Sequence, residues 1–181
     1  LPHLDLPENT QDWMKILLFC AYQGTKNSGK TTRNAARTIA AALGCDYAEW
    51  EVDDLVEGYE STVESILKRQ LSWQTDDIAR QNIQARVRAP GIWMMANIRN
   101  ALLLATSNRS EAAVGYATMD GDTSGGLSPI AGIDKHYLRE WLRFMESTGL
   151  PESPSIKELS QINVQNPTAE LRPEDANQTD E

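Results

Sequence analysis

The chain switches between short apolar runs and longer segments in which apolar residues recur every three or four positions. Apolar runs bounded by polar residues are typical of strands buried on both faces, and they predict strands at 14–22 and 101–105. The short segment 46–52 predicts one more strand. Helical spacing predicts helices over 31–43, 55–69, 76–88, 92–100 and 136–146, and a short one near 156–160. Because strands alternate with helices, we expect an α/β fold with a parallel sheet covered on both faces.

Local signals indicate where several helices end and which side they bury. Gly44 follows the helix at 31–43 and is predicted to end it. Thr75 is predicted to cap the helix at 76–88, and Pro90-Gly91 to break it. Two amphipathic faces are predicted to point inward: Leu55, Val56, Tyr59, Val63, Ile66 and Leu67 on one helix, and Tyr137, Leu138, Trp141, Leu142 and Met145 on another.

Composition narrows the class of protein. The 181 residues suit one domain, and 40% hydrophobic with 24% charged residues is ordinary for a soluble globular chain. A formal net charge of −9 argues against non-specific nucleic-acid binding, and no window is apolar enough for a membrane span. Cys20 and Cys45 are predicted to be free thiols in a reducing compartment; with no visible signal peptide, we expect a cytoplasmic protein.

The chain divides into three regions by composition. Residues 1–12 are predicted to be a linker or insertion, and 13–150 form the α/β core. Proline and polar residues dominate 151–181, which is expected to supply a loop that closes over the substrate. Within it, the acidic tail 170–181 is predicted to stay disordered unless a ligand or partner orders it.

One candidate motif lies between the first predicted strand and helix. Residues 24–31, GTKNSGKT, fit the phosphate-loop pattern, in which backbone N–H groups wrap a phosphate, Lys30 reaches the outer phosphates and Thr31 binds Mg²⁺. Against this interpretation, no apolar strand ends in an aspartate that could serve as the second motif. The alternative is that Ser28 or Thr31 caps the helix and Lys30 is solvated.

A second candidate site follows the apolar run 101–105. Thr106, Ser107 and Asn108 lie where a strand gives way to a helix, an arrangement that offers free backbone N–H groups to an anion. Glu111 either completes a capping box with Asn108 or binds Mg²⁺ that bridges phosphates. The glycine-rich segment 121–126 follows, and the whole stretch indicates an enzyme that handles phosphates.

These residues also carry a family resemblance. The stretch SNRSEAAVGYATMDGDTSGGLSPIAGIDK at 107–135, with QNIQAR at 81–86 and PTAELRP at 167–173, resembles the synthetase domain of NAD synthetase, of the glutamine-dependent type. The resemblance implies a Rossmann-like fold of the adenine nucleotide alpha hydrolase kind. It also implies a homodimeric ligase that uses ATP and Mg²⁺ to adenylate deamido-NAD, which ammonia from glutamine then converts to NAD.

The resemblance assigns roles to particular residues. It implies that ATP is contacted by Thr106, Lys135 and Thr168, and that Mg²⁺ is bound by Glu111, with Glu111 and Lys135 as catalytic residues. Deamido-NAD is expected to contact Asn82, Arg86, Tyr116, Ala117, Thr118 and Met119. Asp120 and Asp122 are either turn formers or ligands. His3 and His136, the only histidines, form no triad with a serine and an aspartate, so no side-chain nucleophile is predicted.

The sequence departs from the family pattern because two expected parts of the protein are missing from it. The pyrophosphate-binding loop SGGxDS and the glutaminase domain are nowhere in these 181 residues. We therefore expect a partial synthetase domain that lacks the first strand of its sheet and depends on segments supplied elsewhere for activity. Two alternatives stay open: a phosphate-loop hydrolase or kinase that uses Lys30 and Thr31, and a non-catalytic fragment that acts as a binding or dimerisation module.

Overall fold

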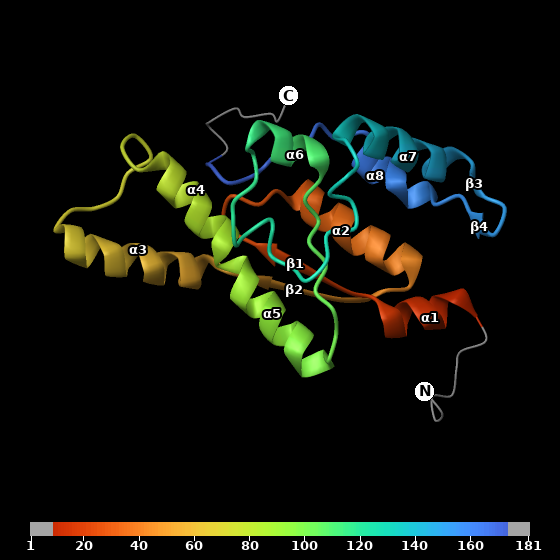
Figure 1. The fold of residues 1–181 in the computed structure, drawn as a ribbon, viewed down its shortest axis with the longest axis horizontal. Helices are drawn as coiled ribbons and strands as arrows, with labels where there is room; N and C mark the ends of the chain where they lie inside the picture. Colours follow the sequence, from red (N-terminus) through yellow and green to blue (C-terminus); the bar gives the residue numbers. More distant parts are fainter. Residues whose placement is uncertain (1–8, 174–181) are drawn as a thin grey trace.

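The computed structural model describes residues 9–173. Strands β1 (Phe19–Gly24) and β2 (Asp46–Glu51) pair in parallel, from Phe19 opposite Asp46 to Gly24 opposite Glu51, and helix α2 (Lys30–Leu43) crosses between them. Two short strands, β3 (Gly149–Leu150) and β4 (Ser153–Pro154), form a separate antiparallel pair. The remaining helices are α1 Thr10–Leu17, α3 Asp53–Leu67, α4 Asp77–Arg86, α5 Arg88–Arg99, α6 Arg109–Val114, α7 Lys135–Ser147, the 3-10 helix η1 Lys157–Leu159 and α8 Ser160–Asn163 (Figure 1).

Helices cover both faces of the parallel pair, as predicted. Alternate residues of a strand point to opposite faces. On one face, Glu49 of β2 pairs with Arg37 of α2 at 2.6 Å. On the other, Asp46 pairs with Arg99 of α5 at 2.7 Å, and Trp50 lies against the α5 backbone at Gly91. The α/β fold with α2 and α5 on opposite sides of the sheet is thus confirmed (Figure 1).

The first predicted strand is only half correct. Residues 14–17 belong to helix α1, and the strand begins at Phe19. Asn9 caps this helix, because its side-chain oxygen accepts a hydrogen bond from the Asp12 N–H at 2.9 Å. A continuous apolar run has no period that separates a helix from a buried strand, so the boundary inside it could not be read.

The predicted strand at 101–105 is also wrong. This segment is irregular, Leu102 is 62% exposed, and only Leu104 forms an isolated parallel bridge, with Leu127. Its backbone bonds run to the glycine-rich segment instead: the Gly126 N–H donates to Leu103 and the Ala105 N–H to Leu127, each at 2.8 Å. The run of apolar residues predicted an extended backbone, but it could not indicate which segment that backbone would bond to.

The glycines of the loop permit this close approach. A Cβ at Gly125 would lie 2.6 Å from the backbone nitrogen of Ala105, and one at Gly121 would lie 3.0 Å from the Ala85 carbonyl carbon of α4. Side chains at these positions would separate the loop from segment 101–105 and from α4. The glycine content therefore reflects tight packing of irregular backbone.

The buried core is small and lies where β2, α3 and α4 meet. Val52, Val56 and Val87 form its buried cluster, and Trp50 and Ile83 pack against it. The break between α4 and α5 falls at Val87, three residues before the predicted Pro90, because proline is tolerated in the first turn of α5. Gly44 ends α2 as predicted, with a φ of 73°.

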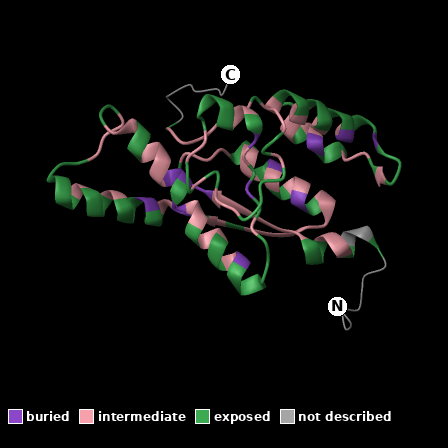
Figure 2. Cartoon of the chain, viewed as in Figure 1, coloured by how far each residue is buried: buried purple, intermediate pink, exposed green. Residues whose placement is uncertain are grey.

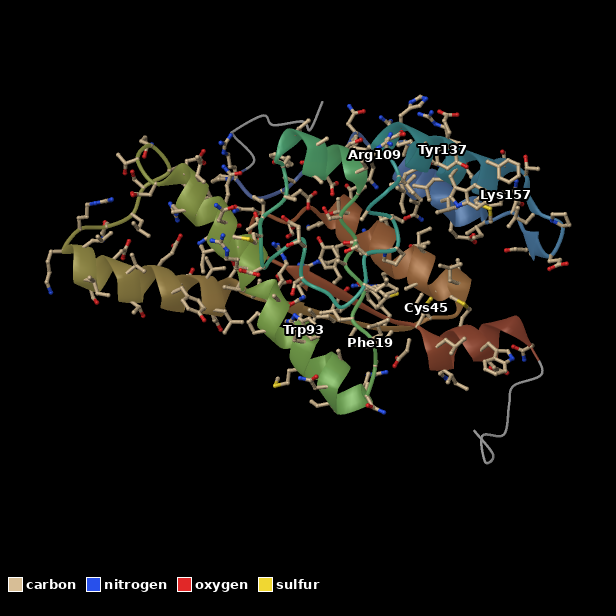
Figure 3. The ribbon with its side chains drawn as sticks, in the orientation of Figure 1. Phe19, Cys45, Trp93, Arg109, Tyr137 and Lys157 are labelled. Carbon is tan, nitrogen blue, oxygen red and sulfur yellow. The ribbon has the colours of Figure 1, made fainter. Side chains whose placement is uncertain are left out.

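Of the two predicted inward faces, the one on α3 is mostly exposed, whereas the one on α7 is partly covered, with Leu138 and Leu142 half-buried. On α3 only Val56 is buried, while Leu55, Tyr59, Val63, Ile66 and Leu67 are 42–73% exposed; Figure 2 shows most of this helix as exposed. On α7, Met145 is buried, but Trp141 is 41% exposed and Tyr137 lies on the outer side with 58% exposed (Figure 3). Amphipathic spacing identifies an apolar face and does not say what covers it.

The two cysteines are free, as predicted. They are nevertheless neighbours, since Cys20 lies in β1 and Cys45 directly precedes β2. Burial, together with the charge and hydrogen bond of Cys45, raises the pKa of the Cys20 thiol to about 11. None of the helices in the described part of the chain has the length and apolar character to span a membrane.

Candidate functional site

Two adjoining cavities lie at the carboxyl end of β1, the end where open α/β sheets bind ligands. The strand-end cavity, about 460 Å³, is lined by the end of β1, the start of α2, the start of α6 and residues 168–171. The α4 cavity, about 500 Å³, lies between α4 and residues 115–119. Tyr116, Asp122 and Leu171 line both cavities, so the two share a wall.

The strand-end cavity collects three of the predicted nucleotide-site residues. Thr106 and Glu111 reach it from the start of α6, and Thr168 reaches it from the C-terminal part of the chain. Ser107 and Thr32 add hydroxyl groups to the same wall. Hydroxyl groups beside a helix start are donors suited to phosphate oxygens.

Glu111 completes the capping box that the sequence predicted. The Asn108 side chain accepts from the Glu111 N–H at 3.1 Å, and Oε2 of Glu111 accepts from the Asn108 N–H at 3.1 Å. The Ser107 hydroxyl donates to the same oxygen at 3.1 Å. The other carboxylate oxygen, Oε1, accepts no hydrogen bond from residues 9–173, so capping leaves one oxygen for a ligand.

Arg88, a residue that the sequence analysis missed, lines the strand-end cavity. Its Nε donates to the carbonyl of Gln23 at 2.9 Å and its Nη1 to the carbonyl of Gln84 at 2.8 Å. Burial lowers the pKa of the guanidinium, which still stays protonated because arginine starts so high. No carboxylate of the described residues forms an ion pair with Arg88, although Asp122 and Glu170 line the same cavity; the cavity therefore contains one half-buried positive charge. Its signal was visible in the sequence as the second arginine of ARVR.

The α4 cavity brings together all six residues predicted to contact the dinucleotide. Asn82 and Arg86 lie one helical turn apart on α4, and residues 116–119 face them. The Thr118 hydroxyl donates to Oδ1 of Asn82 at 2.9 Å, and Nε of Arg86 donates to the Met119 carbonyl at 3.1 Å. Within residues 9–173 the two terminal nitrogens of Arg86 form no hydrogen bond, so they can bind a carboxylate or phosphate.

Asp120 and Asp122 form turns. Asp120 has a φ of 63°, and its N–H donates to the Thr123 hydroxyl at 3.3 Å. Oδ2 of Asp122 accepts from the Thr118 N–H at 2.8 Å, which closes a turn within the loop. Asp122 also lines both cavities, so a turn former here is at the same time part of the site.

Lys135 is the exception among the predicted residues, because it lines neither cavity. It is the first residue of α7, which Asp134 caps by accepting from the Tyr137 N–H at 2.8 Å. That hydrogen bond holds the pKa of Asp134 below its usual range. The Lys135 backbone N–H donates to the Ser110 hydroxyl at 3.0 Å and so ties α7 to α6.

The phosphate-loop interpretation is not favoured. Lys30 and Thr31 are exposed and line neither cavity. The predicted caps are also absent: Gly29 is the N-cap of α2 and has no side chain to cap it, and the Ser28 hydroxyl instead accepts from the Thr25 N–H at 2.9 Å. The N-terminus of α2 is occupied by the carboxylate of Glu170, which accepts from the Gly29 N–H at 2.9 Å.

Glu170 belongs to an irregular segment, residues 167–172, that we call the strap. Its Leu171 carbonyl accepts from Gln84 at 2.7 Å and from Asn27 at 3.3 Å, and Arg172 forms a two-pronged ion pair with Asp77, with Nε 2.8 Å from Oδ1. The tail prediction therefore fails for residues 170–172, which are held by α4 and by the segment at the start of α2. Residues 174–181, the rest of that tail, lie outside the described residues.

The side chains at the strand-end cavity suit a magnesium ion only if the ion is held by one carboxylate together with bound phosphates. Residues 9–173 contain no cluster of three or more histidine, cysteine, aspartate or glutamate side chains that could hold a metal ion. Mg²⁺ at phosphate-transfer sites is commonly held by one or two carboxylates together with the phosphates themselves. The unbonded oxygen of Glu111 at the strand-end cavity fits that mode.

Comparisons with known proteins identify the family. The family model described as NAD synthase matches residues 18–181. A glutamine-dependent NAD(+) synthetase from Aquifex aeolicus is 34% identical over 88% of this chain and 26% of its own length. The crystal structure of such a synthetase from Cytophaga hutchinsonii is 46% identical, with a TM-score of 0.79, over 92% of this chain and 27% of that one.

A more distant structure shares the fold. Glutamine-dependent NAD+ synthetase from Acinetobacter baumannii, solved in complex with ADP, is 24% identical with a TM-score of 0.68, over 82% of this chain and 27% of that one. The chain thus spans about a quarter of the length of these relatives. Because the family model matches residues 18–181, this chain belongs to the NAD synthase family.

Proposed function

We propose that this chain supplies the substrate-binding part of an ATP-dependent amide ligase that converts deamido-NAD to NAD. The strand-end cavity binds ATP through Thr106, Thr168 and the half-buried guanidinium of Arg88. The α4 cavity binds deamido-NAD through Arg86, Asn82 and residues 116–119. The ADP held by the A. baumannii protein of the same fold supports an adenine nucleotide as ligand.

The observation that carries this proposal is the shared wall of the two cavities. Thr106 and Thr168, expected for ATP, line one cavity, and the residues expected for the dinucleotide line the other. Tyr116, Asp122 and Leu171 line both. The reaction requires the nicotinate carboxylate to meet the α-phosphorus of ATP. Two ligands held on either side of one wall can bring these atoms together, and such positioning is a large part of catalysis.

The chemistry needs no nucleophile from the protein. The carboxylate attacks the α-phosphorus and pyrophosphate leaves; ammonia then attacks the acyl carbon of the adenylate and AMP leaves. The guanidinium of Arg88, fixed by two carbonyl groups, can stabilise charge on the phosphates. Mg²⁺, when bound at Glu111, would supply further neutralisation of phosphate charge. Lys135 could join this set only if its side chain reached the cavity.

The two cavities can be tested separately by titration calorimetry of the chain. Replacing Arg86 with Ala should weaken deamido-NAD binding by roughly ten- to a hundredfold, the value of a charge-assisted hydrogen bond, and leave ATP affinity unchanged. Thr106→Val should do the reverse, with a loss of about fivefold in ATP affinity. Arg143→Ala, on exposed α7, is the matched control and should change neither.

The competing interpretation is tested with Lys30→Ala. The ligase proposal expects normal ATP affinity in this variant, whereas a phosphate-loop enzyme would lose nucleotide binding. A chain that binds neither ATP nor deamido-NAD would point to a non-catalytic fragment and overturn the proposal.

We further infer that the protein takes its ammonia from glutamine and works as a homodimer. The named relatives are glutamine-dependent synthetases, which supports a glutaminase domain as the source of ammonia. The exposed apolar face of α3 supports self-association, because patches of this kind mark contact surfaces. Sedimentation should show a dimer that Ile66→Glu weakens and Val164→Glu, at an exposed site near α8, does not. Monomers at every concentration would refute the dimer.

A further inference from the structure

The N-terminus of α2 lacks a local cap. Gly29 at the N-cap has no side chain, and the first turn of α2 contains no acidic residue. In a capping box, a glutamate at the third helical position accepts from the N-cap N–H. Thr32 holds that third position here, and its side chain carries no charge.

Glu170 provides the missing carboxylate from a distant part of the chain. Oε2 accepts from the Gly29 N–H at 2.9 Å, and the Thr32 hydroxyl lies 2.9 Å from Oε2 and 3.1 Å from Oε1. A carboxylate at a helix N-terminus is also favoured by the helix dipole. Glu170 adopts a φ of 49°, in the left-handed region that a non-glycine residue rarely adopts. The surrounding contacts hold this conformation in place.

The contact fixes the position of Thr168. Only Ala169 separates Thr168 from Glu170, and Thr168 lines the strand-end cavity. Beyond Glu170, the Leu171 carbonyl and Arg172 secure the strap to α4. Of these three attachments of the strap, the Glu170 carboxylate is the one nearest to Thr168 in the sequence.

We propose that Glu170 is a positioning residue for nucleotide binding: its carboxylate caps α2 and thereby seats Thr168 at the strand-end cavity. The nucleotide part of this proposal rests on the proposed function. Loss of the carboxylate frees the strap up to Leu171, so Thr168 loses its fixed place and binding must then order it at an entropic cost.

The capping contact is tested first without any ligand. In NMR amide exchange of the full chain, Glu170→Gln should raise the exchange rates of Gly29 and of strap residues 168–170, because a neutral amide accepts less strongly than a carboxylate. Thr32→Val should have a similar effect. Glu152→Gln, at the exposed β3–β4 turn, is the matched control and should change neither set of rates. Unchanged exchange in both Glu170→Gln and Thr32→Val would overturn the proposal.

Nucleotide affinity then separates positioning from direct contact. Glu170→Gln should weaken ATP binding about tenfold, the effect of roughly one charge-assisted hydrogen bond. In a Thr168→Val background the same change should have almost no effect, since the group being positioned is already gone. Equal losses in both backgrounds would overturn the positioning role. If the wild-type chain fails to bind ATP, the proposed function and the nucleotide role of Glu170 both fall, while faster exchange in Glu170→Gln would still show that it caps α2.

Discussion

At the scale of single residues, Glu111 shows how a structural and a chemical role can share one side chain. One carboxylate oxygen accepts from the Asn108 N–H and the Ser107 hydroxyl, and the other forms no hydrogen bond among residues 9–173. The sequence alone left capping and metal binding as alternatives. The geometry makes them compatible, because each uses a different oxygen.

Replacing Glu111 with Gln separates these roles. Glutamine also completes capping boxes, so the free energy of unfolding measured in urea should change by less than about 0.5 kcal/mol. The charge that a magnesium ion needs is lost, so Mg²⁺ should no longer enhance ATP binding measured by calorimetry. Glu111→Ala should lose both properties. Retained enhancement by Mg²⁺ in Glu111→Gln would show that the ion binds elsewhere.

Cys20 should be unreactive at neutral pH. Burial, and then the neighbouring Cys45, raise the pKa of this thiol to about 11. The thiolate is the reactive form, so at pH 8 roughly one thiol in a thousand is able to react. Alkylation by iodoacetamide, followed by mass spectrometry of the native protein, should rise with pH to a midpoint near that pKa. Cys45→Ser should lower the midpoint, whereas a midpoint near 8.5 in the wild type would contradict the burial argument.

At the scale of elements, the sequence predicted some local signals and missed others, because the caps predicted at Thr75 and at Ser28 or Thr31 are absent. The end of α2 at Gly44 and the capping box of α6 were predicted correctly. Each depends on residues within one helical turn of each other, so the local sequence is enough to predict it. The runs 14–17 and 101–105 were misread because their conformation depends on which backbone lies beside them. The sequence identified the apolar face of α3 but could not show whether another part of the protein covers it, because amphipathic spacing does not specify a packing partner.

The glycine-rich loop gives a prediction at this scale. Gly125→Ala places a methyl group 2.6 Å from the backbone of Ala105, so it should destabilise the chain by about 1–3 kcal/mol and displace Thr106. Gly58→Ala, in the middle of α3 with open space around it, should instead stabilise by about 0.5–1 kcal/mol. Urea unfolding of both variants measures these changes. Equal stability for the two would mean that the loop can move aside without cost.

At the scale of the whole molecule, the sequence grouped the site residues but missed what holds them together. The family resemblance predicted six residues that line one cavity and three that line the other. It missed the half-buried guanidinium of Arg88 and the cap that Glu170 supplies. Glu170 lies 141 residues from Gly29, so no local pattern could pair them. Lys135 shows the opposite error, because a family position does not by itself place a side chain in a cavity.

The ion pair between Arg172 and Asp77 joins the strap to α4 across 95 residues, and it makes a prediction about pH. The hydrogen bonds from Arg172 lower the pKa of Asp77. A lowered pKa means that the stabilisation is complete above the unfolded value of about 3.9 and is lost as the pH falls through the lower folded value. The strap should therefore stay attached from neutral pH down to about pH 4.

Carbon-detected NMR titration of the Asp77 carboxyl group measures this shift. Arg172→Gln should raise its midpoint toward the unfolded value. Arg69→Gln, which removes the ion-pair partner of the adjacent Asp76, serves as the control and should leave the Asp77 midpoint in place. A wild-type midpoint at the unfolded value would show that the ion pair adds nothing to the attachment.

The distance along the chain between the strap and the loop that it meets also bears on when the site can form. Asn27, Gly29 and Thr32 leave the ribosome long before Leu171 and Glu170, from which they are separated by 138–144 residues. Closing so long a stretch costs more entropy than forming a local turn, and contacts of this kind slow folding. During synthesis the start of α2 must therefore remain uncapped until translation has passed residue 170, and the cavity beside it forms only after nearly all of residues 9–173 have been synthesised.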